Sequence, residues 1–174
     1  YIGGHLNLSY GSPLAPQMAS ALSRGHGRFR GKGRMTMAVL SGAISPKSVE
    51  AEWRWQIDAA LQAGLTLYFL NSHEHLHQLP PLRRIVVRLA GEYGIPHIRT
   101  LSTDLGASRT SASFARNALI RAIQAIGPAI PQHLRSNTIG LAASRRLDRH
   151  ALRTLFSPLP ATGTSALLRH PLPF

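Results

Sequence analysis

Three histidines, at positions 73, 75 and 77, directly follow an apolar run in this chain of 174 residues. Residues 71–77 read Asn-Ser-His-Glu-His-Leu-His, and residues 65–70, Leu-Thr-Leu-Tyr-Phe-Leu, have the composition of a strand. If the strand continued through the histidines, its alternation would place all three on one face. Neutral imidazole is a common ligand of zinc and other divalent metals, so the segment predicts a metal site. The alternative is a polar loop that is rich in histidine by chance.

A second histidine lies near the start of the chain, in another segment that reads as a strand. Residues 3–8 are Gly-Gly-His-Leu-Asn-Leu, and the two glycines allow another part of the backbone to approach closely. Alone, His5 is a weak signal, because a histidine in a strand is more often a packed core residue. Together with residues 71–77 it places histidines on two predicted strands.

These two segments together resemble the YdjC-like (ChbG/HpnK-type) carbohydrate deacetylases. That family carries an H-L-N-L strand followed by a G-x-P-L turn, matched here by residues 5–8 and 11–14. It also carries a D/N-S-H-x-H-x-H-x-x-P element, matched by residues 71–80. Less specific matches extend the resemblance over nearly the whole chain; they lie at residues 96–99, 140–152 and 163–171.

The resemblance implies a metal-dependent hydrolase that removes acetyl groups from N-acetylated carbohydrates, acting on a sugar or a glycolipid. It implies that His5 and His73 bind a divalent metal, zinc or magnesium, and that His170 is the general acid for the leaving amine. Four further residues are expected to contact the substrate or to surround the metal ligands: Asn71, His75, His77 and Arg99. Glu52 and Gln56 match a family pattern on a helix, and we expect them to be structural or to support the metal ligands, and not to be catalytic.

The chain also departs from the family pattern. The family's first strand ends in an Asp-Asp pair that binds metal and acts as a base, whereas the first acidic residue here is Glu50. The chain begins with Tyr1, and we expect it to lack the segment that carries those carboxylates. Ser165 replaces a glutamate and Leu172 replaces a glycine of the last element. These departures favour the alternative of a non-catalytic member of the same fold.

Charge and composition raise a third interpretation, a basic nucleic-acid-binding domain. The formal net charge is +13, and 18 of the 20 basic residues are arginine. The arginines are mostly scattered and only 6% of residues are aromatic, so no platform for stacking bases is evident. The absence of cysteine excludes disulfides and thiolate metal sites, and it agrees with a cytoplasmic location. No apolar run is long enough to span a membrane.

Predicted strands alternate with predicted helices along the chain. The strands are expected at 1–8, 65–70, 95–99, 137–141 and 165–169, and the main helices at 46–63, 81–93, 111–126 and 148–155. This alternation predicts an α/β domain over residues 1–174 with mainly parallel strands, and the resemblance implies a distorted or incomplete (β/α) barrel. Sites in such folds gather at the carboxyl ends of the strands. An unpaired strand edge would favour association into homo-oligomers.

Overall fold

The structure is a computed structural model that describes residues 2–23, 26–101, 118, 122, 125–139 and 165–167. Its strands form one sheet in the order β1-β2-β3-β4-β5, so each strand lies beside the next one along the chain. Every pairing is parallel, which confirms the predicted α/β class. The strands are β1 (Ile2–Leu6), β2 (Leu67–Ser72), β3 (His97–Leu101), β4 (Arg135–Ile139) and β5 (Ser165–Leu167).

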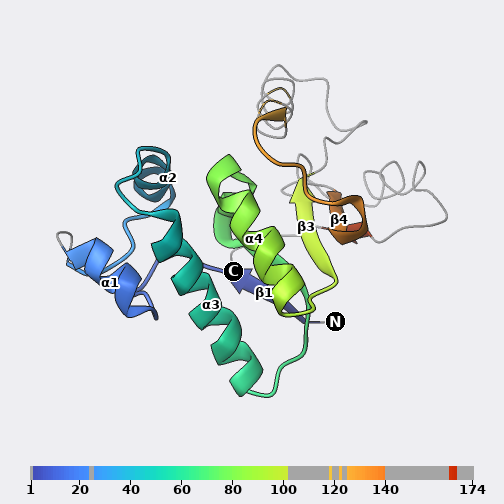
Figure 1. Ribbon diagram of the computed structural model, residues 1–174, viewed down its shortest axis with the longest axis horizontal. Coiled ribbons are helices and arrows are strands. Elements are labelled where there is room, and N and C mark those ends of the chain that lie inside the picture. The colour runs from blue at the N-terminus through green and yellow to red at the C-terminus, as the bar shows by residue number, and fades with distance from the viewer. Residues whose placement is uncertain are drawn as a thin grey trace, which may run out of the picture.

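Two helices, α3 (Pro46–Gln62) and α4 (Pro80–Glu92), lie side by side over one face of the sheet (Figure 1). Their apolar sides close the core against the strands, and the buried side chains include Trp53, Leu70 and Leu89. Among the helices that the structure describes, none is long and apolar enough to cross a membrane.

Local sequence signals explain where α3 begins and ends. The Ser45 hydroxyl accepts a hydrogen bond from the Ser48 backbone N–H at 3.1 Å, which caps the first turn. After the last turn, Gly64 adopts a φ of +79°, a left-handed conformation that glycine takes at little cost. The sequence of α3 places apolar side chains along one face of the helix. These side chains are buried from Val49 to Ile57, but Leu61 at the end of the face is 41% exposed.

Two short helices were not predicted. The first, α1 (Pro16–Leu22), follows a turn-rich loop. The second, α2 (Lys32–Leu40), begins inside residues 23–34, a stretch rich in glycine and basic residues. Neither helix has a side-chain cap or an acidic residue in its first turn, so their sequences carry no start signal beyond Pro16. The predicted helix at 148–155 lies outside the described residues, as does most of the one at 111–126.

Candidate metal and substrate site

His5 and His73 meet at the carboxyl ends of two neighbouring strands. The parallel register of β1 and β2 sets His5 directly opposite Asn71, so the residue two places after Asn71 can reach the His5 ring. The His5 Nε2 atom lies 3.3 Å from the His73 Nδ1 atom, and the two rings meet edge to face at 5.4 Å. His5 is exposed and His73 is half-buried, so the facing nitrogens are open to solvent.

The strand does not continue through the three histidines. β2 ends at Ser72, and residues 73–78 form a 3₁₀ segment in which Glu74 and His75 adopt φ values of +54° and +59°. Left-handed conformations cost a non-glycine residue about 1–2 kcal/mol, so two in succession mark a sharp, imposed turn. The expectation that all three histidines share one face is therefore wrong, because the turn separates them.

His77 lies in the interior and ties this turn to the sheet. Its side chain is fully buried, with its Nδ1 atom 2.7 Å from the Ser72 hydroxyl and its Nε2 atom 2.8 Å from the Arg99 carbonyl oxygen. Burial lowers the pKa of His77 to about 3, because the charged imidazolium would lose its hydration. Because it is buried, the His77 side chain cannot contact a substrate directly.

Asn71 and Arg99 extend the polar group behind His5. The Asn71 side chain is 5% exposed, and its amide lies 2.9 Å from the His5 Nδ1 atom. At the other end of that amide lies the Arg99 Nη1 atom, 3.1 Å away. The Arg99 guanidinium also stacks over the Phe69 ring, 4.5 Å from its centre, and partial burial lowers its pKa.

Tyr10 lies beside the histidine pair, although it was not among the site residues predicted from the sequence. Its ring meets the His73 ring edge to face at 5.4 Å, and its side chain is 58% exposed. A turn brings it back over the strand end, because the Asn7 side-chain oxygen accepts hydrogen bonds from the backbone N–H groups of Ser9 and Tyr10. An asparagine one residue after a strand was the only available signal.

Glu52 and Gln56 anchor this loop from α3, the structural role expected of them. The Gln56 amide accepts from the Asn7 backbone N–H and donates to the Asn7 carbonyl, both at 2.8 Å. The buried Glu52 carboxylate accepts from the backbone N–H groups of Leu14 and Ala15 and from the Gln56 amide. The loop that carries Tyr10 is thus fixed to the helix at two points.

The facing histidine nitrogens suit a metal ion. Two nitrogen ligands at about 2.0–2.1 Å from a tetrahedral metal lie about 3.3–3.4 Å apart, which matches their separation of 3.3 Å. Within the described ranges, no group of three or more histidine, cysteine or acidic side chains could hold a metal ion together. His75 lies farther back, its ring 6.3 Å from that of His77. The predicted general acid, His170, falls outside the described residues.

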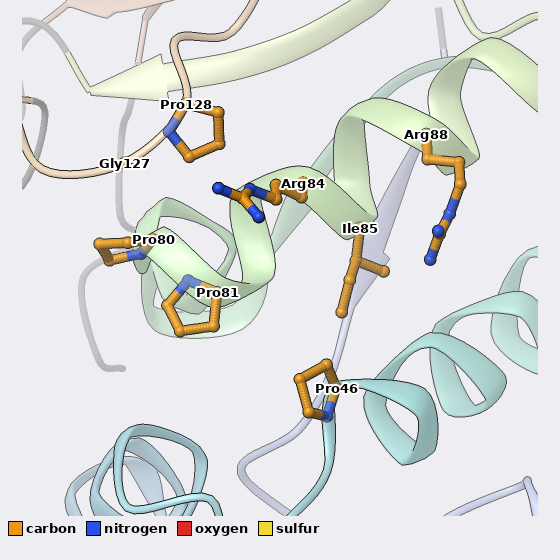
Figure 2. A pocket seen from close by; sticks show the side chains of 8 residues that line it. All are labelled: Pro46, Pro80, Pro81, Arg84, Ile85, Arg88, Gly127 and Pro128. Carbon is orange, nitrogen blue, oxygen red and sulfur yellow. The ribbon is translucent and has the colours of Figure 1, made fainter.

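A cavity of about 440 Å³ lies elsewhere, where α3 and α4 begin (Figure 2). None of the predicted site residues lines it, and Arg88 on its wall pairs with Glu50 of α3. The cavity is lined by Pro46, Pro80, Pro81, Arg84, Ile85, Arg88, Gly127 and Pro128. The histidine site lies at the strand ends, and it is separate from this cavity.

Comparison with known proteins decides the family. The model of the YdjC-like protein family matches residues 1–172, nearly the full length. This chain belongs to the YdjC-like family. A crystal structure from Enterococcus faecalis V583, provisionally named a cellobiose-phosphate cleavage protein, superposes on this chain with a TM-score of 0.66 at 18% identity. That alignment covers 99% of this chain and 60% of the other, and it supports the fold assignment alone.

Curated relatives of this YdjC-like chain are named carbohydrate deacetylases. One from Brevibacillus brevis is 40% identical over 96 residues, covering 55% of this chain and 36% of the relative. One from Danio rerio is 33% identical over 100 residues, covering 56% of this chain and 32% of the relative. One from Listeria monocytogenes serotype 4a is 32% identical over 145 residues, covering 79% and 56%. The chain thus spans about a third to just over half of the length of these relatives.

Proposed function

We propose that this YdjC-like chain carries the metal-binding histidines of a deacetylase that hydrolyses the acetamido group of an N-acetylated sugar or glycolipid. The single observation that carries the proposal is the pair of facing nitrogens, His5 Nε2 and His73 Nδ1, at the carboxyl ends of β1 and β2. Relatives named carbohydrate deacetylases support the substrate class.

Amide hydrolysis explains why such a site would need a metal. The amide carbonyl is a poor electrophile and water is a poor nucleophile, and a bound divalent metal improves both by polarising the carbonyl and lowering the pKa of water. Zinc fits two imidazole ligands best, although a site with added carboxylates would also accept magnesium. His5 and His73 would hold the ion.

The remaining side chains would position these ligands and the substrate. Asn71 contacts the ring nitrogen of His5 that faces away from His73, which fixes the orientation of that ring. His77 holds the turn that presents His73. The exposed Tyr10 ring beside His73 offers a surface on which the apolar face of a sugar ring can pack.

Metal content and acetate release test the proposal together. The purified chain is loaded with zinc, desalted and assayed for bound metal, and acetate release is measured with an N-acetylglucosamine oligosaccharide. We expect about one equivalent of zinc, lost in both His5→Ala and His73→Ala. His133→Ala is the matched control. His133 precedes β4 and so lies at the amino ends of the parallel strands, whereas His5 and His73 lie at the carboxyl ends. Zinc that survives either ligand substitution would contradict the assignment.

A second function, metal binding without turnover, is favoured by one observation. In the part of the chain that the structure describes, the groups that meet at the strand ends are nitrogen ligands without a partnering carboxylate. Hydrolysis needs a base for the attacking water, and histidine ligands already bound to metal cannot supply it. Zinc binding that depends on His5 and His73 but releases no acetate would support this function over the deacetylase.

A further inference from the structure

The orientation of the Asn71 amide is fixed by its neighbours. In one orientation its nitrogen donates to the Gly4 carbonyl oxygen at 3.1 Å while its oxygen accepts from the Arg99 Nη1 atom at 3.1 Å. The opposite orientation would set the amide oxygen against the Gly4 oxygen and the amide nitrogen against the guanidinium. Two opposed contacts in a side chain that is 5% exposed would be costly, so the first orientation holds.

This orientation turns the amide nitrogen toward His5. The nitrogen lies 2.9 Å from the His5 Nδ1 atom, whereas the amide oxygen lies farther from it, at 3.3 Å. The shorter contact requires that Nδ1 accept a hydrogen bond, which places the proton of the neutral ring on Nε2. That proton then points at the His73 Nδ1 atom, 3.3 Å away, which accepts it.

Metal binding through the His5 Nε2 atom requires the other tautomer of the ring. A histidine that binds metal through Nε2 carries its proton on Nδ1, where it usually donates to a carbonyl or carboxylate oxygen. Here that proton would face the nitrogen of the Asn71 amide at 2.9 Å and could be accepted only by the more distant amide oxygen, at 3.3 Å, unless the amide reversed and lost its bonds to Gly4 and Arg99. A metal must therefore displace a hydrogen bond between the histidines, and it must either exchange the shorter contact of His5 Nδ1 for the longer one to the amide oxygen or reverse a buried amide.

We infer that Arg99 and Asn71 form a lock that holds His5 in the tautomer that does not bind metal, and that Asn71 is the residue that weakens the site. The inference rests on the proposed function, since it concerns the same pair of histidines. It predicts that an aspartate at position 71 would accept from both the His5 Nδ1–H and the Arg99 guanidinium. Asn71→Asp should then bind zinc about 10–100-fold more tightly, the usual range for a residue that orients a ligand.

Two independent measurements test the lock. Two-bond proton–nitrogen correlation spectra of isotope-labelled histidine identify the tautomer without any metal, at a pH well above the ordinary histidine pKa of about 6.5. The His5 signals are assigned by their loss in His5→Gln. We expect the Nε2–H form of His5 in the wild-type chain and the Nδ1–H form in Asn71→Asp. Zinc affinity is measured on the same samples by competition with a chelator.

Control variants separate the effect of the lock from the effects of an added negative charge and of unfolding. Gln17→Glu makes the same change from amide to carboxylate at an exposed position of α1, away from the histidines, so its zinc affinity should change little. Arg99→Met removes the donor that orients the amide, and should let the amide reverse and tighten zinc binding without a new charge. Thermal unfolding of each variant shows that it is folded.

The outcomes distinguish failure of the lock from failure of the proposed function. An Nδ1–H tautomer of His5 in the wild-type chain, or equal zinc affinity in the wild type and Asn71→Asp, would overturn the lock. If zinc bound neither chain, the proposed function would fail, and the tautomers would still decide whether the amide controls His5. The expected switch in tautomer, with tighter binding in both Asn71→Asp and Arg99→Met, would support the lock and the site together.

Discussion

Acid should destabilise this protein through His77, and the size of the effect can be worked out from its surroundings. The imidazole is fully buried between the Ser72 hydroxyl and the Arg99 carbonyl oxygen, and burial lowers its pKa to about 3. In the unfolded chain its pKa is about 6.5. Below that pH the unfolded state gains a proton that the folded state does not, so the free energy of unfolding falls as the pH falls.

Between about pH 7.5 and pH 4.5, the free energy of unfolding should fall by roughly 2–3 kcal/mol. The free energy of unfolding would be measured by urea denaturation across this range, for the wild type and for His77→Gln. Glutamine keeps a donor for the Arg99 carbonyl but does not titrate. The other eight histidines and the carboxylates contribute equally to both chains, so the difference between the two curves isolates His77. Curves that run parallel from pH 7.5 to 4.5 would refute the reasoning.

Two further predictions concern stability near the site. Glu52→Gln removes a buried carboxylate that accepts from two backbone N–H groups and the Gln56 amide, and should lower the free energy of unfolding by about 1.5–3 kcal/mol, measured in urea. Gly3→Ala should cost about 1–3 kcal/mol, because the added Cβ would overlap the Phe69 ring. The matched change Gly33→Ala, in α2 with no atom near the added Cβ, should be neutral or stabilising by up to about 1 kcal/mol. An equal loss in both glycine variants would contradict the close approach at Gly3.

The parts of the fold that the sequence predicted are those in which local signals agree with tertiary packing. For α3 the signals were a serine cap, a proline in the first turn, an apolar face and a terminal glycine, and each is found in the structure. The sequence predicted the strands that became β1 and β2 and the histidines near them, but it did not predict that the two strands pair with each other. By contrast, α1 and α2 have weak local signals, and their packing on α3 and on residues 73–78 could not be read from composition.

The same distinction applies to the candidate site. The sequence singled out the three histidines but not their different surroundings, because these depend on two left-handed residues, Glu74 and His75, that no propensity favours. Tyr10 was missed because its contact with His73 depends on a loop held by Asn7 and by Gln56 of a distant helix. Contacts that join segments far apart in the chain leave no periodic pattern in the sequence.

The histidines of residues 73–77 lie in different surroundings, so substitutions at or near them should affect the site in different ways. His73 lies in the open beside His5, whereas His77, four residues later, is buried and holds the turn against β3. A substitution at His77 therefore acts on the site only by moving the turn, whereas a substitution at Asn71 acts directly on the ring of His5. Under the proposed function, stability and metal affinity would depend on different members of one short segment. Variation at position 71 would then alter metal binding while the buried anchor, and the fold that it stabilises, stays the same.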